Sequence, residues 1–301
     1  MSERTKGILC IISAAFCFAL MNLFIKLAGD IPTLQKAFFR NLVAIFFSLY
    51  ILKKNRISLH LESKNLPLLF GRALFGTLGI FFNFYAIDHL NIADASMLNK
   101  LSPFFAILFS YFILKESAKA YQLCCVFTAL AGTLFILKPH GDSLLSLPAC
   151  IGLLGGMAAG LAYTLLRKAT QHGVAGPLIV FFFSLFSCLC SLPYCMFHYT
   201  PMKPIQLFFL LCTGLAASGG QFAITAAYTH APASELSVYD YSQIFFAGIL
   251  GFLFLGETPD ILSYIGYMII IGASIVMFLM RPKNRVQPEQ KAPITTAPDR
   301  S

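Results

Sequence analysis

The sequence predicts an all-α polytopic membrane protein, with ten transmembrane helices arranged as two inverted five-helix repeats. Three observations lead to this fold class. Of the 301 residues, 57% are hydrophobic and only 12% are charged, whereas a soluble domain carries roughly 25% charged residues. Apolar runs follow one another with short polar breaks between them. The second half of the chain resembles the first at an offset of 141 residues.

The apolar runs are long enough to cross a bilayer as helices. A spanning helix needs about 20 mostly apolar residues, and a backbone in hydrocarbon has to satisfy its own hydrogen bonds, which helices and closed barrels do. The strands of a barrel would alternate every second residue, and these runs do not. The runs cover residues 6–28, 34–52, 67–88, 93–114, 120–138, 148–167, 175–197, 204–229, 235–256 and 260–280.

Basic residues predict the orientation of the chain. Lys and Arg are enriched in cytoplasmic loops, and here they gather before the first run and after the second, fourth, sixth and tenth. Both termini are therefore predicted to be cytoplasmic, in a bacterial-type plasma (inner) membrane. Residues 283–301 combine prolines and scattered charge without apolar periodicity, and are predicted to form a disordered cytoplasmic tail.

The internal repeat divides the membrane part into residues 6–140 and 147–281. The offset of 141 residues pairs Lys26 with Arg167 and Ser96 with Ser237, among other matches. Each half has five crossings, an odd number, so the second half enters the membrane from the opposite side. Inverted repeats are typical of secondary transporters, in which two halves exchange conformations about a central site. The alternative is a stable duplicated bundle, as in some channels.

Three short stretches carry a resemblance to a known family. They are Phe38-Phe39-Arg40-Asn41 and the helix ends Ser102-Pro103-Phe104-Phe105 to Leu114-Lys115-Glu116 and Gln243-Ile244-Phe245-Phe246 to Leu255-Gly256-Glu257. Over roughly residues 5–282 the chain resembles the EamA-like branch of the drug/metabolite transporter superfamily. The resemblance implies a ten-helix carrier with inside termini that exports or exchanges small metabolites such as amino acids, amines or drugs. Because Ile244 stands where Pro103 does, a proline break is expected in the fourth helix only.

Polar side chains inside apolar runs are costly, so each is a candidate for function. One face of the fourth helix carries a polar residue at every third position, and the offset places polar residues at the matching positions of the ninth. The two stripes are Ser96, Asn99 and Ser102, and Ser237, Asp240 and Gln243. They are expected to face each other across the bundle axis, where a carrier site lies. The alternative is hydrogen bonding between helices.

Charged residues suggest what the site would hold. Arg40 and Lys100 are expected to hold an anionic group, Arg40 with two hydrogen bonds, although either could instead fix helices or extend to the interface. Asp240 lies between Tyr239 and Tyr241. Its carboxylate could hold an ammonium group by charge, and the two aromatic rings could add cation-π attraction. Asp240 could also couple transport to a proton gradient, or be a solvated aspartate near a helix end. Opposite charges point to an amino-acid-like or zwitterionic substrate.

Amides and an aromatic hydroxyl extend the candidate site. Asn83 and Gln221 supply amides in the third and eighth helices, and Tyr163 in the sixth is the repeat partner of Asn22. They could line the cavity or make structural hydrogen bonds. Arg72, near the cytoplasmic start of the third helix, is interpreted as an interface anchor.

Small residues and missing motifs complete the prediction. Gly152, Gly156 and Gly160 recur every four residues, which predicts close helix packing. No phosphate-loop or H-E-x-x-H motif occurs, and the nine cysteines lie in or beside apolar runs as small hydrophobes. We expect no catalytic residue, cofactor, metal or nucleic-acid partner.

The predicted function is a secondary active transporter, an exporter or exchanger of a small polar or amphipathic metabolite, by alternating access. Its partners would be the small-molecule substrate, the lipid bilayer and a coupling proton or counter-substrate. The oligomeric state is left open. The alternative is a passive membrane channel or a lipid-interacting membrane protein.

Overall fold

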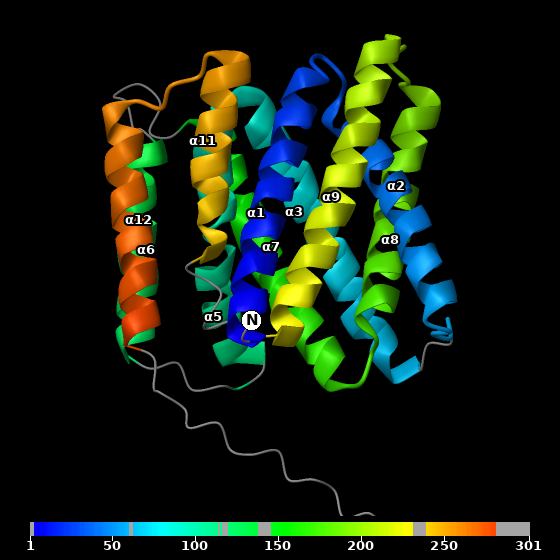
Figure 1. Cartoon of the computed structure of the whole chain (residues 1–301), viewed down its shortest axis with the longest axis horizontal. Helices are drawn as coiled ribbons and strands as arrows, with labels where there is room; N and C mark the ends of the chain where they lie inside the picture. Colours follow the sequence, from blue (N-terminus) through cyan, green and yellow to red (C-terminus); the bar gives the residue numbers. More distant parts are fainter. Residues whose placement is uncertain are drawn as a thin grey trace, which may run out of the picture.

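The computed structural model describes residues 3–59, 63–113, 115, 120–137, 146–230 and 239–280. Over these ranges the chain is a bundle of helices that stand side by side (Figure 1). Eight described helical segments are long and apolar enough to cross a membrane, when the interrupted stretch Ile92–Ile113 is counted as one segment. Two shorter apolar helices, Ala120–Ile136 and Ser242–Leu255, bring the number of crossings to ten. The predicted fold class is confirmed. The predicted tail lies outside the described residues.

The helices follow the predicted runs to within a few residues. The first half holds α1 (Glu3–Leu27), α2 (Thr33–Lys54), the 3-10 turn η1 (Ser63–Asn65), α3 (Leu66–His89), α4 (Ile92–Asn99), α5 (Ser102–Ile113) and α6 (Ala120–Leu137). The second half holds α7 (Leu147–Gln171), α8 (Gly176–Phe197), α9 (Pro204–His230), α11 (Ser242–Leu255) and α12 (Ile261–Leu279). Proline stands in the first turn of α3, α7 and α8, where its missing N–H has no helical partner to lose.

Helices of one half pack mainly against helices of the other. The most extensive contacts join α1 to α9, α3 to α7, α2 to α8 and α6 to α12, and α6 and α12 stand together at one side of the bundle in Figure 1. The first two pairs are equivalent, because each joins the first helix of one half to the third helix of the other. The last two pairs each join a helix to its own repeat partner. The packing therefore has the approximate two-fold symmetry of an inverted repeat.

The fourth crossing is interrupted in its middle. Lys100 and Leu101 form a turn between α4 and α5, and Pro103 has no N–H to offer the carbonyl one turn before it. Phe104 N donates to Leu101 O at 3.0 Å rather than to the carbonyl of Lys100. That carbonyl accepts a hydrogen bond from the Tyr241 hydroxyl at 3.1 Å. A buried backbone group freed in one half is thus satisfied by the other half.

The ninth crossing also contains a turn. Tyr239 and Asp240 are helical, Tyr241 forms a turn, and α11 begins at Ser242. The proline break predicted for the fourth helix is present, and the ninth crossing adds a turn without a proline, which was not predicted. The chain turns here without a proline because Ile244 N bonds to Tyr241 O at 3.0 Å, which is the tighter hydrogen-bonding step of a 3-10 helix.

Two glycines of α7 lie against the interruption in the fourth crossing. A Cβ added to Gly156 would lie 2.4 Å from the carbonyl oxygen of Leu98, and one added to Gly160 would lie 2.7 Å from that of Ser102. Non-bonded heavy atoms make favourable contact only near 3.5–4.0 Å, so neither position has room for a side chain. The predicted close packing of these glycines is confirmed, and its partner is backbone on both sides of the turn.

We predict that Gly156→Ala lowers the stability of the fold, because the added methyl group forces α7 away from α4. Overpacking of this kind costs about 1–3 kcal/mol. The measurement is the apparent melting temperature of the purified protein in detergent. Gly248→Ala is the matched control, since a Cβ there meets nothing within 4 Å. Equal melting temperatures for the two variants would contradict the close contact.

Candidate functional site

The two interrupted crossings meet at an ion pair. Lys100 Nζ lies 2.6 Å from Asp240 Oδ2, and the two side chains are 8% and 13% exposed. Lys100 belongs to the first turn and Asp240 precedes the second, so the pair joins the two halves where both helices break. In this conformation each charge neutralises the other. Lys100 can hold an anion only when the pair opens.

Asp240 keeps one oxygen for a further partner. Its Oδ1 is buried and accepts no hydrogen bond from the described part of the chain. A buried carboxylate oxygen without a donor is costly. The position is therefore suited to a donor that comes from outside the protein.

A second group of charges lies between α2, α3 and α8. The guanidinium carbons of Arg40 and Arg72 lie 5.8 Å and 4.4 Å from the centre of the Phe183 ring. All three residues are buried, with 4%, 6% and 5% of their surfaces exposed. Arg40 and Arg72 repel each other electrostatically, and neither forms an ion pair within the described residues.

Arg40 is held by its chain neighbour. Its Nη1 donates to Asn41 Oδ1 at 2.6 Å, while Asn41 Nδ2 donates to Ala37 O at 2.9 Å and to Ser187 Oγ at 2.8 Å. The amide is thus fixed on both sides. It therefore orients the guanidinium group without neutralising its charge.

Tyr163 lies near both groups of charges. Arg40, Arg72 and Asp240 are all within electrostatic range of its hydroxyl, and the residue is 40% exposed. Tyr163 is thus a predicted site residue within electrostatic range of both the arginines and the Lys100–Asp240 pair.

The remaining predicted site residues are spread over the bundle. Asn83, Tyr241 and Gln243 are buried, and Asn99, Gln221 and Tyr239 are partly buried. The structure brings Tyr241 to the Lys100–Asp240 pair through its hydrogen bond to Lys100 O. In the first polar stripe, Ser96 accepts a hydrogen bond from Asn22 at 3.0 Å, which is a bond between helices. Ser237 lies outside the described residues.

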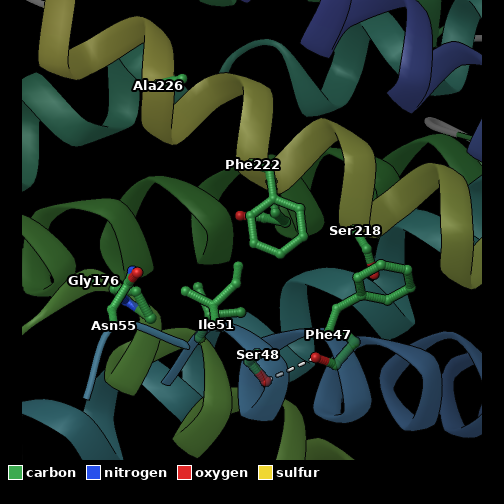
Figure 2. Close-up of a pocket in the computed structure, with 12 residues that line it drawn as sticks. Phe47, Ser48, Ile51, Asn55, Gly176, Ser218, Phe222 and Ala226 are labelled. Atoms are coloured by element: carbon green, nitrogen blue, oxygen red, sulfur yellow. Dashed lines mark hydrogen bonds between the residues drawn. The ribbon is translucent and has the colours of Figure 1, made fainter. Parts of the chain in front are cut away.

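Gln221 lies instead in a cavity near the end of the bundle at which α2 ends and α8 begins. This cavity, of about 290 Å³, lies between α2, α8 and α9. Figure 2 shows Phe47, Ile51 and Phe222 along its walls. Most of the lining is apolar, with Gln221 and Ser48 among the few polar side chains. The sequence did not indicate this cavity.

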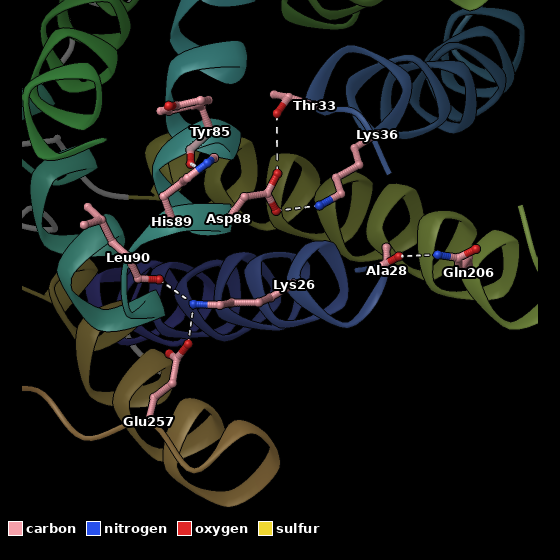
Figure 3. Close-up of polar contacts among 10 residues, drawn as sticks. All are labelled: Lys26, Ala28, Thr33, Lys36, Tyr85, Asp88, His89, Leu90, Gln206 and Glu257. Atoms are coloured by element: carbon pink, nitrogen blue, oxygen red, sulfur yellow. Dashed lines mark hydrogen bonds and ion pairs between the residues drawn. The ribbon is translucent and has the colours of Figure 1, made fainter. Parts of the chain in front are cut away.

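The opposite end, which we name the Lys26 end, is joined by polar contacts between elements (Figure 3). Lys26 forms an ion pair with Glu257 and donates to Leu90 O. Glu257 also accepts from Ile92 N at 2.8 Å, where a carboxylate favours the positive end of the helix dipole. Gly256, with φ of 65°, ends α11 in a left-handed conformation and turns Glu257 toward α4.

Further contacts join neighbouring helices at the Lys26 end. Lys36 Nζ lies 2.5 Å from Asp88 Oδ1, and Thr33 donates to the other oxygen of Asp88 at 3.4 Å, which links α2 to α3. Gln206 at the start of α9 donates to Ala28 O at 3.0 Å, just beyond α1. Figure 3 places these contacts beside the Lys26–Glu257 pair. The ends of α1, α2, α3, α4, α9 and α11 are thus tied together.

The interpretation of Arg72 as an interface anchor is wrong. The residue is 6% exposed, and a Cβ added to Gly76 would lie 2.0 Å from its Nη1. The side chain therefore extends along α3 toward the middle of the helix instead of out to the interface. A glycine one turn after the arginine is the sequence signal that could have indicated this. Phe183 carried no signal, because it stands among other phenylalanines.

Two inverted halves, with interrupted helices that meet at a buried polar centre, define the class of membrane transporters. The sequence profile of the EamA-like transporter family matches residues 5–138 and again 146–279. The chain belongs to the EamA-like transporter family. It is an integral membrane transporter of a small metabolite and not an enzyme.

Named relatives agree with this assignment. The chain is 32% identical over 275 residues to the pseudopaline exporter CntI of Pseudomonas aeruginosa, covering 90% of this chain and 95% of that protein. It is 25% identical to a riboflavin transporter of Brucella anthropi, covering 90% and 96%. A solved crystal structure with 17% identity superposes with a TM-score of 0.65, covering 91% of this chain and 97% of that one. That last likeness shows the fold alone.

We predict that Lys100→Met and Asp240→Asn each destabilise the protein more than the double variant does. Removal of one partner leaves a buried charge without compensation, which costs about 3–5 kcal/mol. The double variant removes both charges. Melting temperatures in detergent measure the difference, and a double variant as unstable as the sum of the two single variants would show that the pair does not interact.

Proposed function

We propose that this chain is a secondary active transporter that exports or exchanges a small polar or amphipathic metabolite by alternating access. The observation that carries the proposal is the Lys100–Asp240 ion pair, which joins the interrupted crossings of the two halves. Interrupted helices at the repeat interface are where carriers bind their substrates. A pair made between halves can open when the halves rock against each other.

The two ends of the bundle support a conformation that is closed on one side. The Lys26 end is tied by the Lys26–Glu257 and Lys36–Asp88 ion pairs. The 290 Å³ cavity lies toward the other end. With both termini in the cytoplasm, as the basic loops predict, the Lys26 end would face outside and the cavity would lie toward the cytoplasm. Export would begin with entry from that side.

The site supports a substrate that carries charge. A substrate ammonium group would donate to Asp240 Oδ1, which has no donor within the described chain. An anionic group of the substrate would bind the positive charge of Arg40. An amino-acid-like or zwitterionic metabolite fits both. The likeness to a pseudopaline exporter supports outward transport, and the likeness to a riboflavin transporter indicates that this fold carries different metabolites.

The alternative is a passive channel or a lipid-interacting membrane protein. The apolar lining of the 290 Å³ cavity is the observation that favours lipid. A carrier exchanges substrate across a closed cycle, whereas a pore does not. Saturable flux that speeds up when unlabelled substrate is present on the far side therefore separates the two.

The test is uptake into proteoliposomes from a mixture of amino acids, amines, nucleosides and organic acids, read by mass spectrometry with and without a pH gradient. We expect one chemical class to accumulate, with saturation and counterflow. If Asp240 couples transport to protons, Asp240→Asn loses gradient-driven accumulation but keeps exchange. Flux that rises linearly with concentration and shows no counterflow would contradict the carrier.

We predict that Glu257→Gln loosens the Lys26 end, because it removes both the ion pair to Lys26 and the charged acceptor of Ile92 N. Hydrogen exchange measured by mass spectrometry should become faster by about tenfold in the first turn of α4, since the loss of one charge-assisted bond of roughly 1.5 kcal/mol corresponds to a factor of about ten.

The matched control for this prediction is Asp30→Asn. Asp30 is an exposed carboxylate at the same end of the bundle, so its replacement should leave exchange in α4 unchanged. Unchanged exchange in both variants would mean that Glu257 does not hold the Lys26 end together.

A further inference from the structure

Two arginines share one buried aromatic ring and lack an anion. Arg40 Nε, Arg72 Nε and Arg72 Nη1 are buried and donate no hydrogen bond within the described residues. A buried cation without a partner is among the most costly groups in a protein interior, and a second cation beside it adds repulsion. If these side chains served only to fill space, leucine or methionine would do so without charge.

The surroundings keep both guanidinium groups in place. Asn41 binds Arg40 Nη1 and is itself fixed by Ala37 O and Ser187 Oγ. Gly76 leaves the space that Arg72 Nη1 occupies, since a Cβ there would lie 2.0 Å from this atom. A site whose donors are held before the ligand arrives loses less entropy on binding.

The ring of Phe183 contacts both cations without neutralising them. A cation over an aromatic face gains electrostatic attraction from the ring, and here the same ring serves Arg40 at 5.8 Å and Arg72 at 4.4 Å. Phe183 thus brings the two guanidinium groups to one place. Their remaining N–H groups are left for an acceptor.

Other charged groups nearby do not supply that acceptor. Asp240 is engaged with Lys100 at 2.6 Å, and the hydroxyl of Tyr163 is a neutral group within electrostatic range of both arginines. Because Lys36 and Lys100 are paired, Arg40 and Arg72 are, among the residues that the structure describes, the buried positive charges that remain open to an anion in this conformation.

We propose that Arg40 and Arg72 together bind a carboxylate group of the transported metabolite, which makes a small organic acid or a carboxylated zwitterion the substrate class. The guanidinium fork matches the two oxygens of a carboxylate. This inference rests on the proposed carrier function and replaces the earlier assignment of Lys100 to the anionic group. Inorganic phosphate and the headgroup of an anionic lipid share the oxyanion chemistry, so the test includes both.

The test is the melting temperature of the purified full chain in detergent, with acetate, succinate, citrate or glutamate as probes and sodium chloride at equal ionic strength as reference. We expect at least one carboxylate to raise the melting temperature of the wild type. The rise should disappear in Arg40→Gln and Arg72→Gln, and persist in Arg56→Gln, which alters an exposed arginine after α2. Inorganic phosphate and phosphatidylglycerol micelles are tested in parallel.

The unliganded variants separate binding from a structural role. If the arginines await a ligand, Arg72→Gln without any probe melts at or above the temperature of the wild type, because an uncompensated charge has been removed. If they hold the fold together, it melts lower. Gly76→Ala keeps both charges but displaces Arg72, so it should lose the carboxylate response as well.

Several outcomes would overturn the inference. The first is that none of the four carboxylates raises the melting temperature of the wild type, and the second is that a carboxylate raises that of Arg72→Gln by the same amount. The third is that unliganded Arg72→Gln melts below the wild type. The fourth is that phosphate or phosphatidylglycerol raises the melting temperature of the wild type while no carboxylate does. Counterflow separates this inference from the proposed function. A carrier whose exchange is unchanged in Arg72→Gln keeps its function without the carboxylate site, whereas a carboxylate response without any counterflow keeps the site without the carrier.

Discussion

The hydrocarbon core of a membrane offers no hydrogen bonds, so a helix that is interrupted there depends on other parts of the protein. In this chain the interrupted crossings of the two halves contact each other. The carbonyl of Lys100 has no helical partner because of the turn before Pro103, and it accepts a hydrogen bond from the Tyr241 hydroxyl of the other half. The Lys100 side chain pairs with Asp240. Other polar elements lie close to this contact: the glycines of α7 pack against its backbone, and Tyr163 is within electrostatic range of Asp240 and of the arginines.

Much of the fold could be predicted from the sequence, because run length, charge and repeat all depend on local composition. The same reasoning identified Arg40, Lys100 and Asp240 as intramembrane charges, since each interrupts an apolar run. It could not tell that Lys100 and Asp240 neutralise each other, because that contact depends on how the two turns meet. The turn at Tyr241 was missed because a 3-10 step needs no proline. Arg72 was misassigned because its depth was counted from the helix start, whereas the direction of a long side chain decides where its charge lies.

The backbone of the bundle is nearly symmetric, but its chemistry is not. Repeat partners pack in equivalent pairs, as in α1 with α9 and α3 with α7. The offset that relates the halves places Phe181 opposite Arg40 and Thr213 opposite Arg72, so the two arginines have no charged counterparts in the second half. Symmetry serves the exchange of conformations, which needs two similar halves. Recognition of a substrate needs one oriented site, and the asymmetric residues are those that we propose for it.

The contact of Gly156 and Gly160 with the interrupted helix has a consequence for how such a protein changes over evolution. This contact is made mainly of backbone atoms and otherwise of the Cβ of Phe105, so it does not depend on the identity of Arg40, Arg72 or Phe183. Arg40, Arg72 and Phe183 lie on other helices. If these three residues select the cargo as we propose, mutations there change the cargo and leave the contact between α7 and the interrupted helix as it is. Duplicated copies of one gene could then diverge in cargo without first rebuilding the packing of the two halves.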